Sequence, residues 1–162
     1  MVEQRDIDII MKSPIDWEYF RNKTVLVTGA TGRIGMYIVE AINKADIDWN
    51  LNVTILALAR NEKKLQEVFG ESLKLPNIHP LVQDITEPIH WDGNVHYIFH
   101  TAGAASPQDF TNWPVDTLWG HVQGTRNVLE LAREKKTEKV FYVSTVETYG
   151  EWKSEQGIRE DD

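Results

Sequence analysis

The stretch "KTVLVTGATGRIG" (residues 23–35) decides the fold of this 162-residue chain. Its first half is a β-branched apolar run, which predicts a strand buried on both faces. Its second half holds three glycines, and apolar residues at helical spacing follow, namely Ile34, Ile38, Ala41, Ile42 and Ala45. We expect these five side chains on the buried face of an α-helix. The stretch therefore predicts a strand, a glycine-rich loop and a helix in succession.

The glycine loop predicts a dinucleotide site. Gly29 permits a tight turn, Gly32 lets a pyrophosphate approach bare backbone, and Gly35 lets the helix pack close to the strand. The free N–H groups and the positive dipole at the helix amino end favour a phosphate there. The expected contacts also include Thr31, Arg33 and Ile34. A glycine-rich turn without a ligand is the alternative.

The order of elements outward from this loop predicts the architecture. Further strands are expected at 52–59, 78–84, 95–100 and 139–145, with helices over 61–70 and about 115–135. This alternation implies right-handed crossovers and a doubly wound parallel α/β sheet, an NAD(P)-binding Rossmann fold. In the long helix we expect a buried stripe of Leu118, Val122, Thr125, Leu129 and Ala132. Residues 1–22 predict a short helical extension, and residues 23–162 the dinucleotide-binding domain.

Composition and charge exclude several classes of function. The net charge of −8 and the pI near 5.1 disfavour partners such as nucleic acid or an anionic membrane. The absence of cysteine excludes disulfides, thiolate catalysis and Cys-ligated metal, and we expect no metal site. The sequence shows neither a signal-peptide core nor a membrane-spanning apolar run, so a cytoplasmic protein is expected.

The residue after the second expected strand bears on the choice of cofactor. A carboxylate at this position would bind the adenosine ribose of NAD. Arg60 stands there instead, and a guanidinium can pair with a 2′-phosphate, to which Lys63 or Lys64 can add charge. The sequence therefore favours NADP over NAD. A solvated arginine without a ligand is the alternative.

Five motifs in order resemble the N-terminal half of the extended short-chain dehydrogenase/reductases, the NAD-dependent epimerase/dehydratase family. They are "TGATGRIG" (28–35), "QDI" (83–85), "HTAGAASP" (100–107), "GTRNVLELA" (124–132) and "VSTVETYG" (143–150). The resemblance implies an enzyme that transiently oxidises a sugar hydroxyl of a nucleotide sugar and returns the hydride to the same bound cofactor. It also implies that Asp84 accepts from the adenine amino group, beside Ile85, and that Ala102 and Gly103 line the cofactor. For Asp84, a strand-end turn residue is the alternative.

Within the family, two of the motifs look most like UDP-glucuronate decarboxylases and sugar 4,6-dehydratases. The pattern S-T-x-E-x-Y-G implies that Thr145 hydrogen-bonds the sugar hydroxyl and that Glu147 is a general base or orients the substrate. The dehydratases carry an acid between these residues, where this chain has Val146. The absence of this acid therefore favours a decarboxylase or an epimerase over a dehydratase. An exposed carboxylate without such a role is the alternative for Glu147.

Tyr149 and Lys153 have the Y-x-x-x-K spacing of a catalytic pair, but Gly150 disfavours the helix that the pair needs. We interpret the spacing as coincidence and expect that these residues lack the catalytic Tyr/Lys helix and the C-terminal substrate domain. A non-catalytic NAD(P)-binding sensor or scaffold, and a reductase using Tyr149, remain alternatives. His121 stands where the family carries Asn. The resemblance implies a homodimer built on helix 115–135 and the next helix, so this chain is expected to pair poorly.

Overall fold

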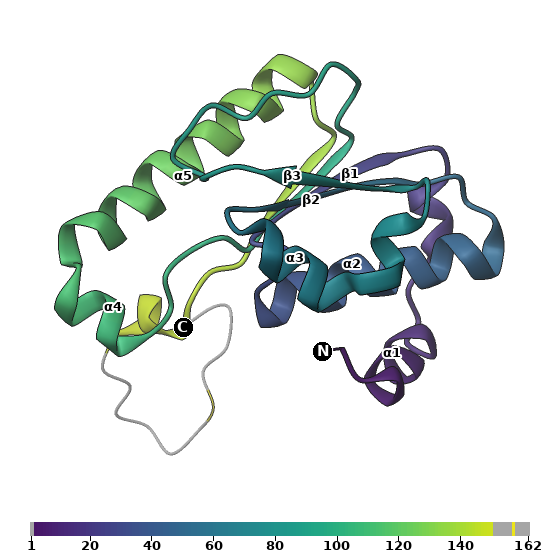
Figure 1. Ribbon diagram of the computed structural model, residues 1–162, viewed down its shortest axis with the longest axis horizontal. Helices are drawn as coiled ribbons and strands as arrows, with labels where there is room; N and C mark the ends of the chain where they lie inside the picture. The colour runs from purple at the N-terminus through teal and green to yellow at the C-terminus, as the bar shows by residue number, and fades with distance from the viewer. Residues whose placement is uncertain (1, 151–156, 158–162) are drawn as a thin grey trace.

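The computed structural model describes residues 2–150 and 157, and it confirms the doubly wound sheet (Figure 1). All five strands are parallel and lie in the order β3-β2-β1-β4-β5. Their bounds are β1 Thr24–Thr28, β2 Thr54–Ala59, β3 Ile78–Val82, β4 Tyr97–His100 and β5 Lys139–Tyr142. Each one falls within a strand that the sequence predicts.

Two hydrophobic cores cover the two faces of the sheet, because successive strand residues point to opposite sides. Val25 and Val27 of β1 pack in the core that includes α2 (Arg33–Trp49) and α3 (Glu62–Phe69). Leu26 packs on the other side, in the core that includes α5 (Pro114–Lys135). Among the described residues, no helix combines the length and the apolar character that crossing a membrane requires.

The segment before β1 packs on α2. Helix α1 (Gln4–Met11) buries Ile7, and the hydroxyl of Tyr37 in α2 donates to Asp6 over 2.7 Å. A 3-10 turn (Trp17–Phe20) follows, and the ring of Trp17 stacks on that of Trp49, with centroids 6.3 Å apart.

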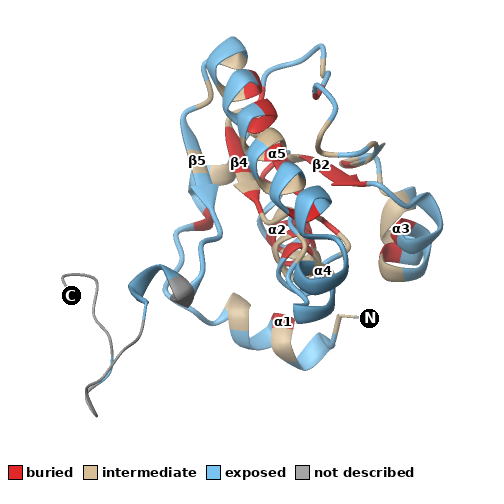
Figure 2. Ribbon diagram, turned by 90° about the vertical axis from the view of Figure 1, so that its left-hand side faces the viewer, coloured by how far each residue is buried: buried red, intermediate tan, exposed pale blue. Residues whose placement is uncertain are grey.

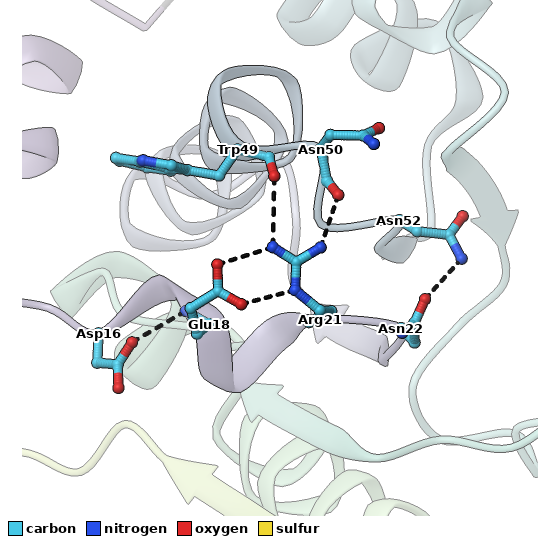
Figure 3. A network of polar contacts seen from close by, with 7 residues as sticks. All are labelled: Asp16, Glu18, Arg21, Asn22, Trp49, Asn50 and Asn52. Carbon is cyan, nitrogen blue, oxygen red and sulfur yellow. Dashed lines mark hydrogen bonds and ion pairs between the residues drawn. The ribbon is translucent and has the colours of Figure 1, made fainter.

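Arg21 connects this turn to the carboxyl end of α2 (Figure 3). Its guanidinium donates to both carboxylate oxygens of Glu18, at 2.6 and 2.7 Å, and to the carbonyl oxygen of Asn50 at 2.9 Å. Asn50 is the C-cap of α2, and a cation there is favoured by the helix dipole.

The expected buried stripe of α5 is wrong. Leu118, Val122 and Leu129 are 65%, 58% and 54% exposed, and Thr125 and Ala132 are only partly buried. The buried residues are Thr117, Gly124, Asn127, Val128 and Leu131, about one position away around the helix. The helix is rotated in this way because its inner face contacts the loop after β3. Ile85 packs against Gly124, and Asn127 donates to two carbonyl oxygens of that loop.

Two smaller differences concern the first turn of α2 and an additional short helix. Ile34 is 52% exposed, because it lies in the first turn of α2 beside the open edge of the sheet, whereas Ala41, Ile42 and Ala45 are buried as expected. A short helix, α4 (Pro107–Asn112), precedes α5 and was not predicted. Its signals are present in the sequence: Ser106 caps the amide of Asp109, and Pro107 is the first helical residue.

Candidate dinucleotide-binding site

The residues expected to bind the cofactor all follow the carboxyl ends of parallel strands, and so they gather at one edge of the sheet. The glycine loop follows β1, Arg60 follows β2, and Ala102 and Gly103 follow β4. Strands β1 and β4 are neighbours, yet the chain continues from them to opposite sides of the sheet. Such a switch point is where open α/β sheets bind ligands.

The glycine loop has the backbone geometry that its sequence predicts. Gly29 has φ +66°, and a Cβ atom on it would lie 2.8 Å from the Cα of Ala102. A Cβ atom on Gly35 would lie 2.4 Å from the carbonyl oxygen of Gly29. A side chain at either position would therefore collide with backbone atoms of the site.

The amino end of α2 is open toward the edge. Gly32 is exposed, is the N-cap residue, and has no side chain to cover the first turn. Thr31 is partly buried, while Arg33 and Ile34 are exposed. Uncovered N–H groups, a positive dipole end and bare backbone fit a pyrophosphate.

Arg60 and Asp84 lie at the ends of β2 and β3. Arg60 is exposed. One oxygen of Asp84, Oδ1, accepts from the amide of Thr86 at 2.9 Å and from its hydroxyl at 2.8 Å. The Thr86 amide, then its hydroxyl, and the charge of Arg60 lower the pKa of Asp84, so this carboxylate is ionised at neutral pH. The turn role of Asp84 is thus observed, and its contact with adenine stays a prediction.

A buried polar group beneath the edge was not predicted. His100 is 3% exposed, and its Nδ1 lies 2.7 Å from Thr28 Oγ1 while its Nε2 lies 3.3 Å from Thr125 Oγ1. Burial lowers the pKa of His100, and the nearby His121 lowers it further. The same Thr28 hydroxyl oxygen accepts from the amide of Ala102 at 3.3 Å. The signal was a histidine that ends a strand and begins the "HTAGAASP" motif.

The proposed catalytic residues are described only in part. Thr145 is exposed just beyond β5, and its carbonyl oxygen accepts from the Thr148 hydroxyl at 2.9 Å. Glu147 belongs to the 3-10 turn Val146–Tyr149, and its side chain is outside the description. The described side chains contain no group of three or more that could hold a metal ion.

The Tyr149–Lys153 spacing can be judged only from its first residue, because Lys153 lies outside the described residues. Tyr149 ends the 3-10 turn, and Gly150 has φ +70°. A right-handed helix that carried both side chains would need a negative φ at Gly150. The backbone therefore argues against a working pair.

The chain belongs to the NAD dependent epimerase/dehydratase family, because the model of this family matches residues 25–162. Membership in this family implies a nicotinamide cofactor. The chain is 30% identical over 129 residues to UDP-glucose 4-epimerase of Rickettsia felis. It is 31% identical over 132 residues to the protein of the same name from Rickettsia rickettsii. Each alignment covers 78% of this chain but only 37% of the relative, so the chain spans well under half of these relatives.

Solved structures of similar fold include UDP-N-acetylglucosamine 4-epimerase from Methanobrevibacter ruminantium M1 in complex with UDP-N-acetylmuramic acid. It matches 88% of this chain and 44% of its own length, with a TM-score of 0.69 and 21% identity. Pen from Bacillus thuringiensis matches 76% of this chain and 38% of its own length, with a TM-score of 0.63 and 26% identity.

Proposed function

We propose that this chain is the dinucleotide-binding part of an enzyme that transforms a nucleotide sugar by transient oxidation of a sugar hydroxyl. The observation that carries the proposal is the contact of the glycine loop with the loop after β4, where Gly29 leaves room for the backbone of Ala102 at the switch point. Family membership and relatives named UDP-glucose 4-epimerase support a nucleotide sugar as substrate and favour epimerisation over decarboxylation or dehydration.

In this proposal each strand end has a separate task. The amides at the amino end of α2 hold the pyrophosphate, with Thr31, Arg33 and Ile34 beside it. Asp84 and Ile85 face the adenine, and Ala102 and Gly103 line the opposite side. A nicotinamide cofactor held by these residues would supply reversible hydride transfer with the sugar.

The residues after β5 would act on the sugar. Thr145 lies at the same edge as the cofactor loops, so its hydroxyl can hydrogen-bond the sugar hydroxyl that is oxidised. Glu147 follows two residues later and is proposed as a general base or an orienting carboxylate. Both roles rest on the S-T-x-E-x-Y-G pattern.

Arg60 is proposed to select NADP. It is exposed at the end of β2, where it can pair with a 2′-phosphate. Its positive charge also lowers the pKa of Asp84. If Arg60 only balanced the charge of Asp84, the two dinucleotides would bind equally well.

The test is calorimetric titration of the purified chain with NADP and, separately, with NAD. We expect tighter binding of NADP, and a loss of about 1.5–3 kcal/mol for NADP alone in Arg60→Ala, because a charge-assisted hydrogen bond is removed. Arg133→Ala, at the far end of α5, is the matched control and should change neither affinity. Equal affinities would overturn the assignment of NADP, and no binding of either dinucleotide would overturn the proposed function.

A further inference from the structure

One face of α5 supports two of the loops at the carboxyl edge of the sheet. His121, Gly124 and Asn127 follow each other at intervals of three positions in "HVQGTRN" (residues 121–127), which places them on neighbouring parts of the helix surface. His121 contacts the loop after β4. Gly124 and Asn127 contact the loop after β3.

His121 holds the loop after β4 in two ways. Its Nε2 lies 3.0 Å from the carbonyl oxygen of Ala104, and because a carbonyl can only accept, Nε2 carries the proton. Its ring also lies close to the backbone of Gly103, since a Cβ atom on Gly103 would come within 2.4 Å of Cε1 of His121. The position of Gly103 is therefore set by the imidazole.

Asn127 holds the loop after β3. It is 8% exposed, and its amide nitrogen donates to the carbonyl oxygens of Ile85 at 2.9 Å and Glu87 at 3.0 Å. The amide is itself oriented, because Gln123 donates to its oxygen at 2.8 Å. Gly124 leaves room for Ile85, whose side-chain atoms would lie 3.0 Å from an added Cβ atom.

We propose that His121 and Asn127 are positioning residues that fix the separation of the two loops between which the dinucleotide binds. The inference rests on the proposed function, which places Asp84 in one loop and Gly103 in the other. A dinucleotide that spans both loops binds well only when their spacing is correct, so loss of either support lowers affinity without removing a direct contact.

The experiment measures the dissociation constants of NAD and NADP, together with the melting temperature, for substitutions at His121. The amide nitrogen of Gln can occupy the place of the histidine Nε2, whereas the shorter Asn reaches only the place of Nδ1. We expect about fivefold weaker binding in His121→Ala, recovery in His121→Gln, and no recovery in His121→Asn.

A control separates positioning from stability. Leu51→Ala removes core contacts on the opposite face of the sheet from α5, since Leu51 is 0% exposed and packs in the core that includes α2 and α3. It should lower the melting temperature and leave both dissociation constants unchanged. Asn127→Ala should weaken binding at least as much as His121→Ala.

Affinity within twofold of the original chain in His121→Ala would overturn the inference while leaving the proposed function intact. Recovery by Asn and not by Gln would overturn it as well, because the donor would then not be Nε2. If the unmodified chain bound neither dinucleotide, the proposed function would fail, and the inference with it.

Discussion

His100 is a buried histidine whose protonation opposes folding. Its imidazole is enclosed between two threonine hydroxyls, and burial lowers its pKa in the folded state. Below the unfolded pKa of about 6.5, His100 is protonated in the unfolded chain while it stays neutral in the folded chain. The stability that the neutral ring supports is thus complete above pH 6.5 and is lost as the pH falls through the folded pKa.

We therefore predict that the free energy of unfolding falls faster with acidification in the original chain than in His100→Gln. The difference in slope can reach about 1.4 kcal/mol per pH unit between the two pKa values. Urea unfolding at pH 7.5, 6.5 and 5.5 measures it. Since the four other histidines remain in the variant, equal slopes would mean that His100 does not carry this dependence.

A second prediction at this scale concerns Gly35. A methyl group there would meet the carbonyl oxygen of Gly29 at 2.4 Å, and backbone cannot move aside as a flexible side chain can. Gly35→Ala should lower the free energy of unfolding by about 1–3 kcal/mol. Gly120→Ala is the matched control, because nothing lies within 4 Å of its added Cβ atom inside α5. It should raise stability by up to about 1 kcal/mol, and chemical denaturation of both variants decides.

At the scale of elements, the segment before β1 is part of the folded unit. Trp17 is 8% exposed and stacks on Trp49, whereas Tyr19 in the same turn is 67% exposed. We expect Trp17→Ala to lower the free energy of unfolding by about 3 kcal/mol, since a large buried ring is lost. Tyr19→Ala should change it by less than about 0.5 kcal/mol. Similar effects of the two substitutions would show that the turn packs differently from the arrangement described.

The order of elements could be predicted from the sequence because each signal was local. Apolar runs such as "KTVLVTG" mark buried strands, and Gly70, the C-cap of α3, has a positive φ that glycine adopts readily. The rotation of α5 could not be predicted in this way. Its apolar positions repeat with a period of about 3.5 residues, which predicts that they are buried. The side of α5 that is buried is instead the one where Gly124 and Asn127 contact the distant loop after β3.

The backbone geometry of the candidate site could be predicted for similar reasons, while the binding roles of its residues stay predictions. The glycines could be assigned because their turn and close packing follow from one short stretch. His100 and His121 could not, because their partners, Thr28 and Ala104, are far away along the chain. Residues whose conformation follows from a short stretch are visible in the sequence, and residues that contact distant segments are visible only in the fold.

At the scale of the whole molecule, much of α5 is exposed (Figure 2), and large apolar side chains are among its exposed residues. Val115, Leu118, Val122 and Leu129 are 76%, 65%, 58% and 54% exposed. They alternate at intervals of three and four positions, with Thr125 between them, in the pattern of a coiled-coil seam. A contiguous apolar surface of this kind favours a partner.

From this seam we predict that the chain associates with itself at micromolar concentration. The prediction differs from the expectation, drawn from the family resemblance, that the chain pairs poorly. Leu118→Glu combined with Val122→Glu should give monomers, because the charges would be buried without partners. Sedimentation equilibrium over a hundredfold range of concentration measures the mass, which is 18.7 kDa for one chain. Val82→Glu is the matched control, since Val82 is 50% exposed on β3, away from the seam, and should leave association unchanged. A constant mass of one chain at all concentrations would show that the seam alone is too small to hold two copies together.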